Sequence, residues 1–358
     1  MSEIYLEPLP TGPLTDTGWH DDVLGAGFEA RTLPLLDDDQ GPVVATLVRY
    51  VPGNDPLAHA GTPTATRFVG LWIHGWNDYF HQRELARVIA RLGGAFYALD
   101  LRKYGRSLRA GQLHGYITNL STYDEDFHAA LAVIRDEVGI GTDLVLMGHS
   151  TGGLVAALWA HRHPGALRAL VLDAPWLELQ GSVITRTLGT QLIDTLSRVN
   201  PTGIVPLADT GFYARTLAGW IPDDDGERPP GTAGDPFYDG WQLDPNWKSR
   251  TSALVRPGWL SAIRAGQSQV AQGLEITCPI LVLTSARTNY SPRWLPELRE
   301  VDSVLDVEQI AQRSLGLGPL VTLARFDGAV HDVFLSRQAV RTRVYCELER
   351  WLRAYAIR

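Results

Sequence analysis

One serine of this 358-residue chain lies at a sharp corner between two regular patterns. Gly148, Ser150 and Gly152 form a G-x-S-x-G sequence that joins the apolar run 143–149 to a helical pattern. Such a strand–turn–helix corner exposes a serine hydroxyl at the carboxyl edge of a sheet, and its glycines allow neighbouring segments to approach closely. A simple turn in which Ser150 caps the helix is the alternative. The context favours a nucleophilic Ser150.

Two further features suit acyl chemistry at this corner. His331 follows a late apolar run, 320–326, and no other of the ten histidines has such a place, so we expect it to be the general base. Trp76 follows the apolar run 67–75 and Thr151 follows the serine, so their backbone N–H groups are the expected oxyanion donors. We interpret Asp332, next to His331, as a helix N-terminal residue rather than as its partner.

The elements that must position these residues alternate between strand and helix. This order predicts an α/β fold, with a mostly parallel central sheet flanked by helices. The expected strands are residues 28–36, 41–51, 67–75, 95–101, 143–149, 167–175, 279–285 and 320–326. The expected helices are residues 79–93, 120–139, 152–165, 307–315 and 333–355.

The alternation stops between residues 178 and 275, where Pro, Gly and Trp are frequent and clear strand runs are missing. We therefore expect a discontinuous core, residues 1–177 and 276–358, with an inserted cap at 178–275. Aromatic residues in the cap can line an apolar acyl pocket or can form the small core of the cap itself. They are Phe212, Tyr213, Trp220, Phe237, Tyr238, Trp241, Trp247 and Trp259.

Composition limits the partners. The net charge of −8 and the absence of a basic cluster argue against nucleic-acid binding. The apolar runs are much shorter than the ~20 residues of a membrane span, and the first residues do not resemble a secretion signal. The two cysteines, Cys278 and Cys346, could form one disulfide, but we expect two reduced and buried thiols, which suggests a cytoplasmic protein. No ligand spacing indicates a metal, and no glycine loop indicates a nucleotide cofactor.

Together these motifs resemble the α/β-hydrolase superfamily. Within it, the chain looks most like the group of monoacylglycerol lipases, lysophospholipase-like esterases and serine-aminopeptidase-like hydrolases. The resemblance is carried by the His-Gly-Trp run 74–76, the turn "LDLRKYGRS" from Leu99, the "GHSTGG" run from Gly148, and His331. It covers nearly the whole core, from about residue 28 to the C-terminus, whereas the cap is similar only in position and size.

The resemblance implies a Ser, acid, His order along the chain. The acid of the family closely follows the strand expected at 279–285, but Arg287 stands there and an extra stretch follows. Asp302 then matches a family-like turn into a helix, and we interpret it as the acid. Asp306 is the alternative acid, although its spacing to Gln309 is typical of a helix cap. Asp173 is a weaker third possibility.

The resemblance implies a serine hydrolase that cleaves a small carboxylic ester with an apolar acyl or alcohol part. A Ser150–His331–Asp302 triad would act through an acyl-enzyme, with no cofactor. An amidase, a peptidase or an acyltransferase could use the same triad. A non-enzymatic binding protein on this fold stays open as well, because fold alone does not determine function. The oligomeric state is not predicted.

Overall fold

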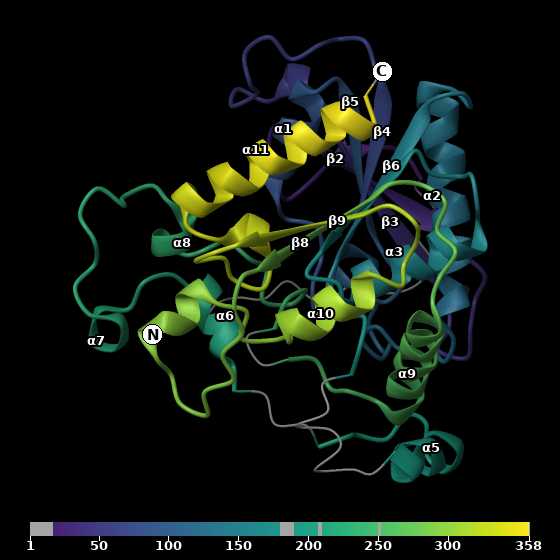
Figure 1. Cartoon of the computed structure of the whole chain (residues 1–358). Coiled ribbons are helices and arrows are strands. Elements are labelled where there is room, and N and C mark those ends of the chain that lie inside the picture. The colour runs from purple at the N-terminus through teal and green to yellow at the C-terminus, as the bar shows by residue number, and fades with distance from the viewer. Residues whose placement is uncertain (1–16, 180–189, 207–209, 250–251, 358) are drawn as a thin grey trace.

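A nine-stranded sheet runs through the part of the chain that the computed structural model describes, residues 17–179, 190–206, 210–249 and 252–357 (Figure 1). The strands lie in the order β1-β2-β3-β5-β4-β6-β7-β8-β9. Their bounds are β1 His20–Asp21, β2 Phe28–Pro34, β3 Val44–Tyr50, β4 Phe68–Ile73, β5 Gly94–Asp100, β6 Asp143–His149, β7 Ala169–Asp173, β8 Ile280–Ser285 and β9 Val321–Phe326. Each of the eight expected strands is present, whereas β1 was not expected.

The sheet is mostly parallel, as predicted. Strands β1, β2, β3 and β5 pair antiparallel, and the pairs from β5 across to β9 are parallel. Parallel strands place their carboxyl ends at one edge of a sheet. The segments that follow β4, β6, β7, β8 and β9 therefore meet there, and these segments carry the residues that the sequence singled out.

Helices cover both faces of the sheet (Figure 1). Helices α1 (Arg83–Arg91) and α11 (Gln338–Tyr355) pack on one face. Helices α2 (Tyr123–Val138), α3 (Thr151–Arg162) and α10 (Val307–Ser314) contribute to the core on the other face. Side chains of a strand point alternately to the two faces of the sheet. Leu71 of β4 therefore packs in the core under α2, α3 and α10, and its neighbour Trp72 packs in the core under α1 and α11. Both are fully buried, which makes β4 a rigid support for the turn after it.

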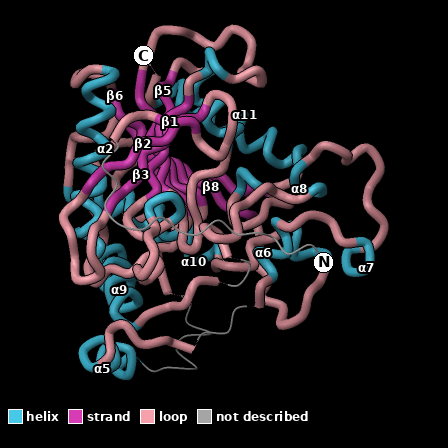
Figure 2. The backbone as a smooth tube through the Cα atoms, turned by 180° about the vertical axis from the view of Figure 1, so that it is seen from behind, coloured by secondary structure: helices cyan, strands magenta, loops and turns pink. Residues whose placement is uncertain are grey.

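Between β7 and β8 the regular structure of the described chain consists of helices joined by loops. It contains α5 (Thr190–Val199), α6 (Phe212–Leu217), α7 (Pro222–Asp225), α8 (Pro236–Asp239) and α9 (Pro257–Gln272). Helices α5, α6 and α9 lie below the strands in both Figure 1 and Figure 2. Helix α9 packs into the main core through Leu260 and Ile263. Its Gly266 lies close to Leu120, because a Cβ added to this glycine would be 2.6 Å from the Leu120 side chain. The cap boundaries at 178 and 275 stay a prediction, and residues 180–189 lie outside the described part.

Two expectations from the sequence are wrong. The last helix begins at Gln338 rather than at residue 333, because Val333–Leu335 forms a short 3-10 helix and the backbone at Ser336 is extended. Asp332 caps this turn by accepting a hydrogen bond from the Phe334 N–H, which confirms its N-terminal place. Cys278 is buried, but Cys346 is exposed, and both are unpaired. Across the described residues, no helix has the length and apolar character needed to cross a membrane.

Candidate active site

Ser150 lies in a strained turn between β6 and α3. Its φ of 52° and ψ of −116° are rare for a residue with a side chain. The flanking glycines make the turn possible, because a Cβ on Gly148 would lie 2.5 Å from the carbonyl oxygen of Gly152. A Cβ on Gly152 would lie 2.2 Å from the carbonyl oxygen of His74. This close packing is typical of a nucleophile elbow.

His331 and Asp302 form a buried pair beside this turn. The Nδ1 atom of His331 lies 2.9 Å from Oδ2 of Asp302, and the two side chains are 3% and 0% exposed. The other carboxylate oxygen of Asp302 accepts the backbone N–H groups of Val304 and Leu305, at 2.8 and 2.7 Å. These bonds hold the carboxylate in one orientation. A hydrogen on Nδ1 satisfies Oδ2 and leaves Nε2 of His331 as the ring nitrogen that can accept a proton.

The extra stretch after β8 loops out and returns Asp302 to the end of that strand. Asp302 donates its N–H to the carbonyl of Arg287 at 2.9 Å and accepts the N–H of Asn289 at 3.1 Å. Thr288 and Asp302 thus form an isolated parallel bridge. Asp302 therefore lies next to the end of β8, although about fifteen positions separate it from Arg287 in the sequence.

The looped-out stretch also supports the segment between β7 and β8. It contains a 3-10 helix, Pro296–Glu300, whose Arg299 is 1% exposed. The Arg299 guanidinium donates to the carbonyls of Thr216 and Gly219 and pairs with Asp225 at 2.8 Å. The looped-out stretch therefore anchors α7 and α6, and α6 lines part of the cavity described below.

The other acidic possibilities have structural roles. Asp306 caps α10 by accepting the N–H groups of Glu308 and Gln309 at 2.9 and 3.3 Å, as its spacing predicted. Asp173 ends β7, is fully buried, and lies 3.1 Å from the Nδ1 atom of His149. Among the three carboxylates, Asp302 is the one hydrogen-bonded to His331 in the described structure.

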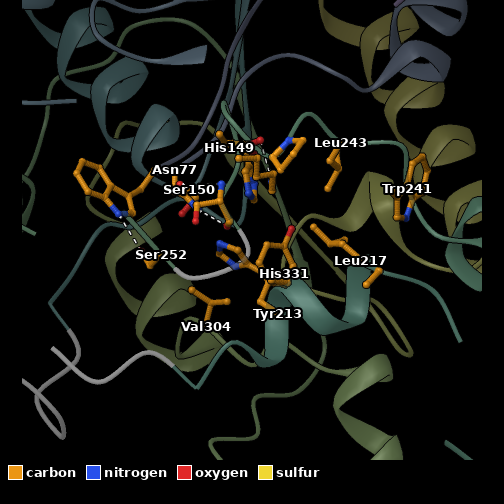
Figure 3. A pocket seen from close by; sticks show the side chains of 17 residues that line it. Asn77, His149, Ser150, Tyr213, Leu217, Trp241, Leu243, Ser252, Val304 and His331 are labelled. Carbon is orange, nitrogen blue, oxygen red and sulfur yellow. Dashed lines mark hydrogen bonds and ion pairs between the residues drawn. The ribbon is translucent and has the colours of Figure 1, made fainter. Parts of the chain in front are cut away.

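Ser150 and His331 line one cavity of about 410 Å³, in which Figure 3 shows their side chains close together. From this point the cavity extends past Leu243 and Leu217 to Trp241. Ala218 adds a further apolar side chain to the lining, and Val304 lies near His331 (Figure 3). The rest of the lining is more polar. Asn77 and Ser252 lie on the other side of Ser150 (Figure 3), and Trp76, Asp78, Lys248 and Ser249 also line the cavity.

The polar part of the cavity holds an ion pair that the sequence did not reveal. The ammonium of Lys248 lies 2.8 Å from Oδ1 of Asp78, and both side chains are buried. Burial alone would raise the pKa of Asp78, but Lys248 and the nearby His81 lower it well below its usual value. Because Lys248 follows a segment without regular pattern, only the folded chain reveals its partner.

The expected oxyanion donors lie on either side of the serine. The turn that holds Trp76 abuts the elbow, since a Cβ on Gly75 would lie 3.2 Å from Cβ of Ser150. Thr151 begins α3. Within the described ranges, neither the Trp76 nor the Thr151 backbone N–H has an acceptor in the protein. Both groups are therefore available to a ligand atom, although their role as donors stays a prediction.

The aromatic residues expected in the cap divide between the two predicted uses. Tyr213 and Trp241 line the cavity, and the Tyr213 ring meets the His331 ring edge to face at 5.4 Å. Trp259 is buried in the main core, 3.8 Å between ring centroids from Trp76. Phe237 is buried in a small separate cluster. The aromatic content therefore serves packing as well as the cavity.

Comparison with known proteins identifies the family. The family model described as "Serine aminopeptidase, S33", of the Hydrolase_4 type, matches residues 65–293, so the chain belongs to this hydrolase family. Ser150 lies inside the matched range, whereas Asp302 and His331 follow it.

Sequence relatives match over shorter stretches. A monoacylglycerol lipase of Mycolicibacterium smegmatis is 33% identical over 115 residues, which cover 31% of this chain and 39% of that protein. Lysophospholipase L2 of Escherichia coli is 32% identical over 100 residues, 27% of this chain and 29% of that one. The aligned regions thus span less than half the length of both relatives.

Solved structures show the same fold across most of the chain. A soluble variant of the Saccharomyces cerevisiae monoglyceride lipase aligns over 98% of this chain and 99% of that one, with a TM-score of 0.59 and 14% identity. A monoacylglycerol lipase of Paleococcus ferrophilus aligns over 82% and 96%, with a TM-score of 0.54 and 18% identity. The predicted α/β-hydrolase fold is therefore confirmed.

Proposed function

We propose that this protein is a serine hydrolase that cleaves carboxylic esters with an apolar acyl part. The observation that carries the proposal is the buried His331–Asp302 hydrogen bond, 2.9 Å long, at the cavity where the elbow presents Ser150. A nucleophile, a base and a group that orients the base are the parts of a catalytic triad.

In this mechanism His331 takes the hydroxyl proton of Ser150 through Nε2 while the serine oxygen attacks the ester carbonyl. Asp302 keeps the ring in the correct tautomer and stabilises the imidazolium. The backbone N–H groups of Trp76 and Thr151 stabilise the oxyanion. The C–O bond then breaks, His331 gives its proton to the departing alcohol, and an acyl-enzyme remains. Water repeats the sequence and releases the acid.

The cavity supports an ester with one apolar and one polar part. Leu217, Leu243 and Trp241 can surround an acyl chain, and burying each methylene contributes about 0.8 kcal/mol. The polar lining on the other side of Ser150 suits an alcohol that carries hydrogen-bonding groups. The names of the lipase relatives agree with this substrate class. We propose that residues 178–275 act as the cap that determines the acyl preference.

An aminopeptidase activity is the second candidate, because the family model carries that description. A protein that binds a peptide N-terminus needs an unpaired carboxylate near the nucleophile. Asp78 is the acidic residue among the described residues that line the cavity, and Lys248 already pairs with it. This pairing favours an ester over a substrate with a free ammonium group.

The test is hydrolysis of a chain-length series of p-nitrophenyl esters and a matched series of aminoacyl p-nitroanilides. We expect ester turnover that Ser150→Ala abolishes while the thermal unfolding temperature is preserved. Turnover of the anilides alone would replace the ester proposal with the aminopeptidase. The absence of turnover on both series would favour a binding protein, and unchanged activity in Ser150→Ala would refute the mechanism.

A further inference from the structure

A second pair of buried acids lies beside the proposed triad and takes no part in the mechanism above. Asp173 is the last residue of β7, and Asp332 directly follows His331. Both are completely buried. One carboxylate oxygen of each and one ring nitrogen of His149 all lie within 4.8 Å of one another. Two like charges this close in a dry site do not both ionise at ordinary cost.

The two carboxyls connect the end of β7 to the turn that carries His331. Oδ1 of Asp173 accepts the Val333 N–H at 3.3 Å, and Oδ1 of Asp332 accepts the Phe334 N–H at 2.9 Å. Oδ2 of Asp332 accepts from the Gln82 side chain at 2.8 Å. Three of the four carboxyl oxygens therefore have a donor within the protein.

The fourth oxygen, Oδ2 of Asp173, has no donor among the described residues. The Nδ1 atom of His149 lies 3.1 Å from this oxygen but lacks the geometry of a hydrogen bond. This Nδ1 atom has no hydrogen-bond partner among the described residues either. An unpaired buried carboxylate oxygen costs several kcal/mol. A proton on this oxygen removes the charge and supplies a donor toward Asp332. Burial and the neighbouring Asp332 charge both raise the pKa of Asp173 well above its usual value.

We propose that Asp173 and Asp332 share one proton at neutral pH and that Asp173 is thereby a positioning residue for the His331 turn. The hydrogen bond between Asp173 and Asp332 holds the turn that carries His331 in place, while the bond to Asp302 orients the His331 ring. The positioning part rests on the proposed role of His331, whereas the shared proton does not depend on any activity.

Other titratable groups also face the pair. They are His149 on β6, His331 in the turn itself, His81 before α1, Tyr213 on α6 and Tyr345 on α11. Burial raises the pKa of both tyrosines, so they stay neutral, and burial lowers the pKa of His81. Because His149 lies 3.1 Å from Asp173, the comparison below is repeated in a His149→Gln background, which removes this ring from both proteins.

Asp173→Asn tests the shared proton without any substrate. The asparagine N–H₂ replaces the acidic proton as donor to Asp332, and its oxygen still accepts from Val333. In the wild type the folded pKa lies above the unfolded value of about 3.9, so the unfolded chain releases a proton that the folded chain keeps. The contribution of this pair to wild-type stability therefore falls as pH rises from about 4 to the folded pKa.

The measurement is denaturant unfolding of both proteins between pH 4 and pH 9. We expect the folding equilibrium constant of Asp173→Asn, divided by that of the wild type, to rise about tenfold per pH unit until the folded pKa is reached. A ratio that does not change with pH, or falls, would refute the shared proton. A wild-type loss of stability on treatment with a chelator would refute it too, because a cation would then hold the three side chains together.

The positioning role is tested by kcat on the best p-nitrophenyl ester. Asp173→Ala removes the donor and is expected to lower kcat at least tenfold, the equivalent of one buried hydrogen bond of about 1.4 kcal/mol. Asp173→Asn is expected to restore kcat at pH 7. The wild type should lose kcat above the folded pKa, where the shared proton is released, whereas Asp173→Asn keeps its N–H₂ donor and should not. Equal losses in both variants would refute positioning. A wild type inactive on all substrates would refute the proposed function but leave the stability test intact.

Discussion

Replacing Asp302 by asparagine separates the proposed chemistry from the stability of the fold. The asparagine oxygen can still accept the Val304 and Leu305 N–H groups that now bind Oδ1. Its NH₂ group then stands where Oδ2 faces His331, 2.9 Å from Nδ1. Two donors would oppose one another there, so the ring must turn its unprotonated nitrogen to the amide. The hydrogen moves to Nε2, which can no longer take the proton of Ser150.

The magnitude follows from these contacts. In triads of this geometry, exchange of the acid for its amide lowers kcat by about 10⁴-fold, which is about 5.5 kcal/mol in the barrier. The loss in stability is that of one charge-assisted hydrogen bond, about 1.5–3 kcal/mol. We therefore expect Asp302→Asn to remain folded and to be almost inactive.

The assay is kcat for a short p-nitrophenyl ester, with Asp306→Asn as the matched control. Asp306 caps α10 and touches neither His331 nor the cavity, and asparagine is an equally good cap. The control should keep kcat close to that of the wild type. A loss of less than tenfold in Asp302→Asn, or a loss seen only in Asp306→Asn, would refute the assignment of the acid.

Two further predictions concern the cavity wall and its support. Trp241 lines both the catalytic cavity and a second cavity of about 620 Å³. Trp241→Ala should raise kcat/KM for longer acyl esters about fourfold per added methylene. An unchanged chain-length profile, equal to that of Trp241→Phe, would show that Trp241 does not limit the chain. Arg299→Ala leaves Asp225 buried without its partner and should lower the free energy of unfolding by about 3 kcal/mol. Arg287→Ala is the control, because it removes an exposed ion pair with Asp327, and it should lower the free energy of unfolding by less than about 1 kcal/mol. Equal losses for the Arg299 and Arg287 variants in a denaturant titration would contradict this reasoning.

The strands and the serine corner could be predicted because their signals are local. Eight apolar runs became strands within a few residues, and the G-x-S-x-G spacing placed Ser150 at the turn between β6 and α3. The glycines indicate positions where a side chain would not fit, as the close contacts of Gly148 and Gly152 show. Asp302 was expected as the acid because the turn before α10 resembles that of the family, although nothing local indicated the bridge to Thr288 that returns Asp302 to β8.

Other features depend on contacts between distant segments and leave no local signal. The Asp78–Lys248 pair joins residues 170 positions apart. Asp173 at the end of β7 meets Asp332, which follows β9, although β8 lies between these two strands. The start of the last helix was placed too early because "VFLSRQ" has helical composition, whereas tertiary contacts hold Val333–Leu335 in a separate turn. Pairings of this kind follow from topology, which periodicity alone does not specify.

The central claim is that Ser150 becomes acylated, and pre-steady-state hydrolysis of a p-nitrophenyl ester tests it most directly. The account predicts a burst of p-nitrophenol of up to one equivalent per active enzyme when deacylation is the slower step, with a trapped acyl group that mass spectrometry places on Ser150. Ser150→Ala should show no burst and no adduct. An acyl group found on another residue, or the same burst in Ser150→Ala, would contradict the account.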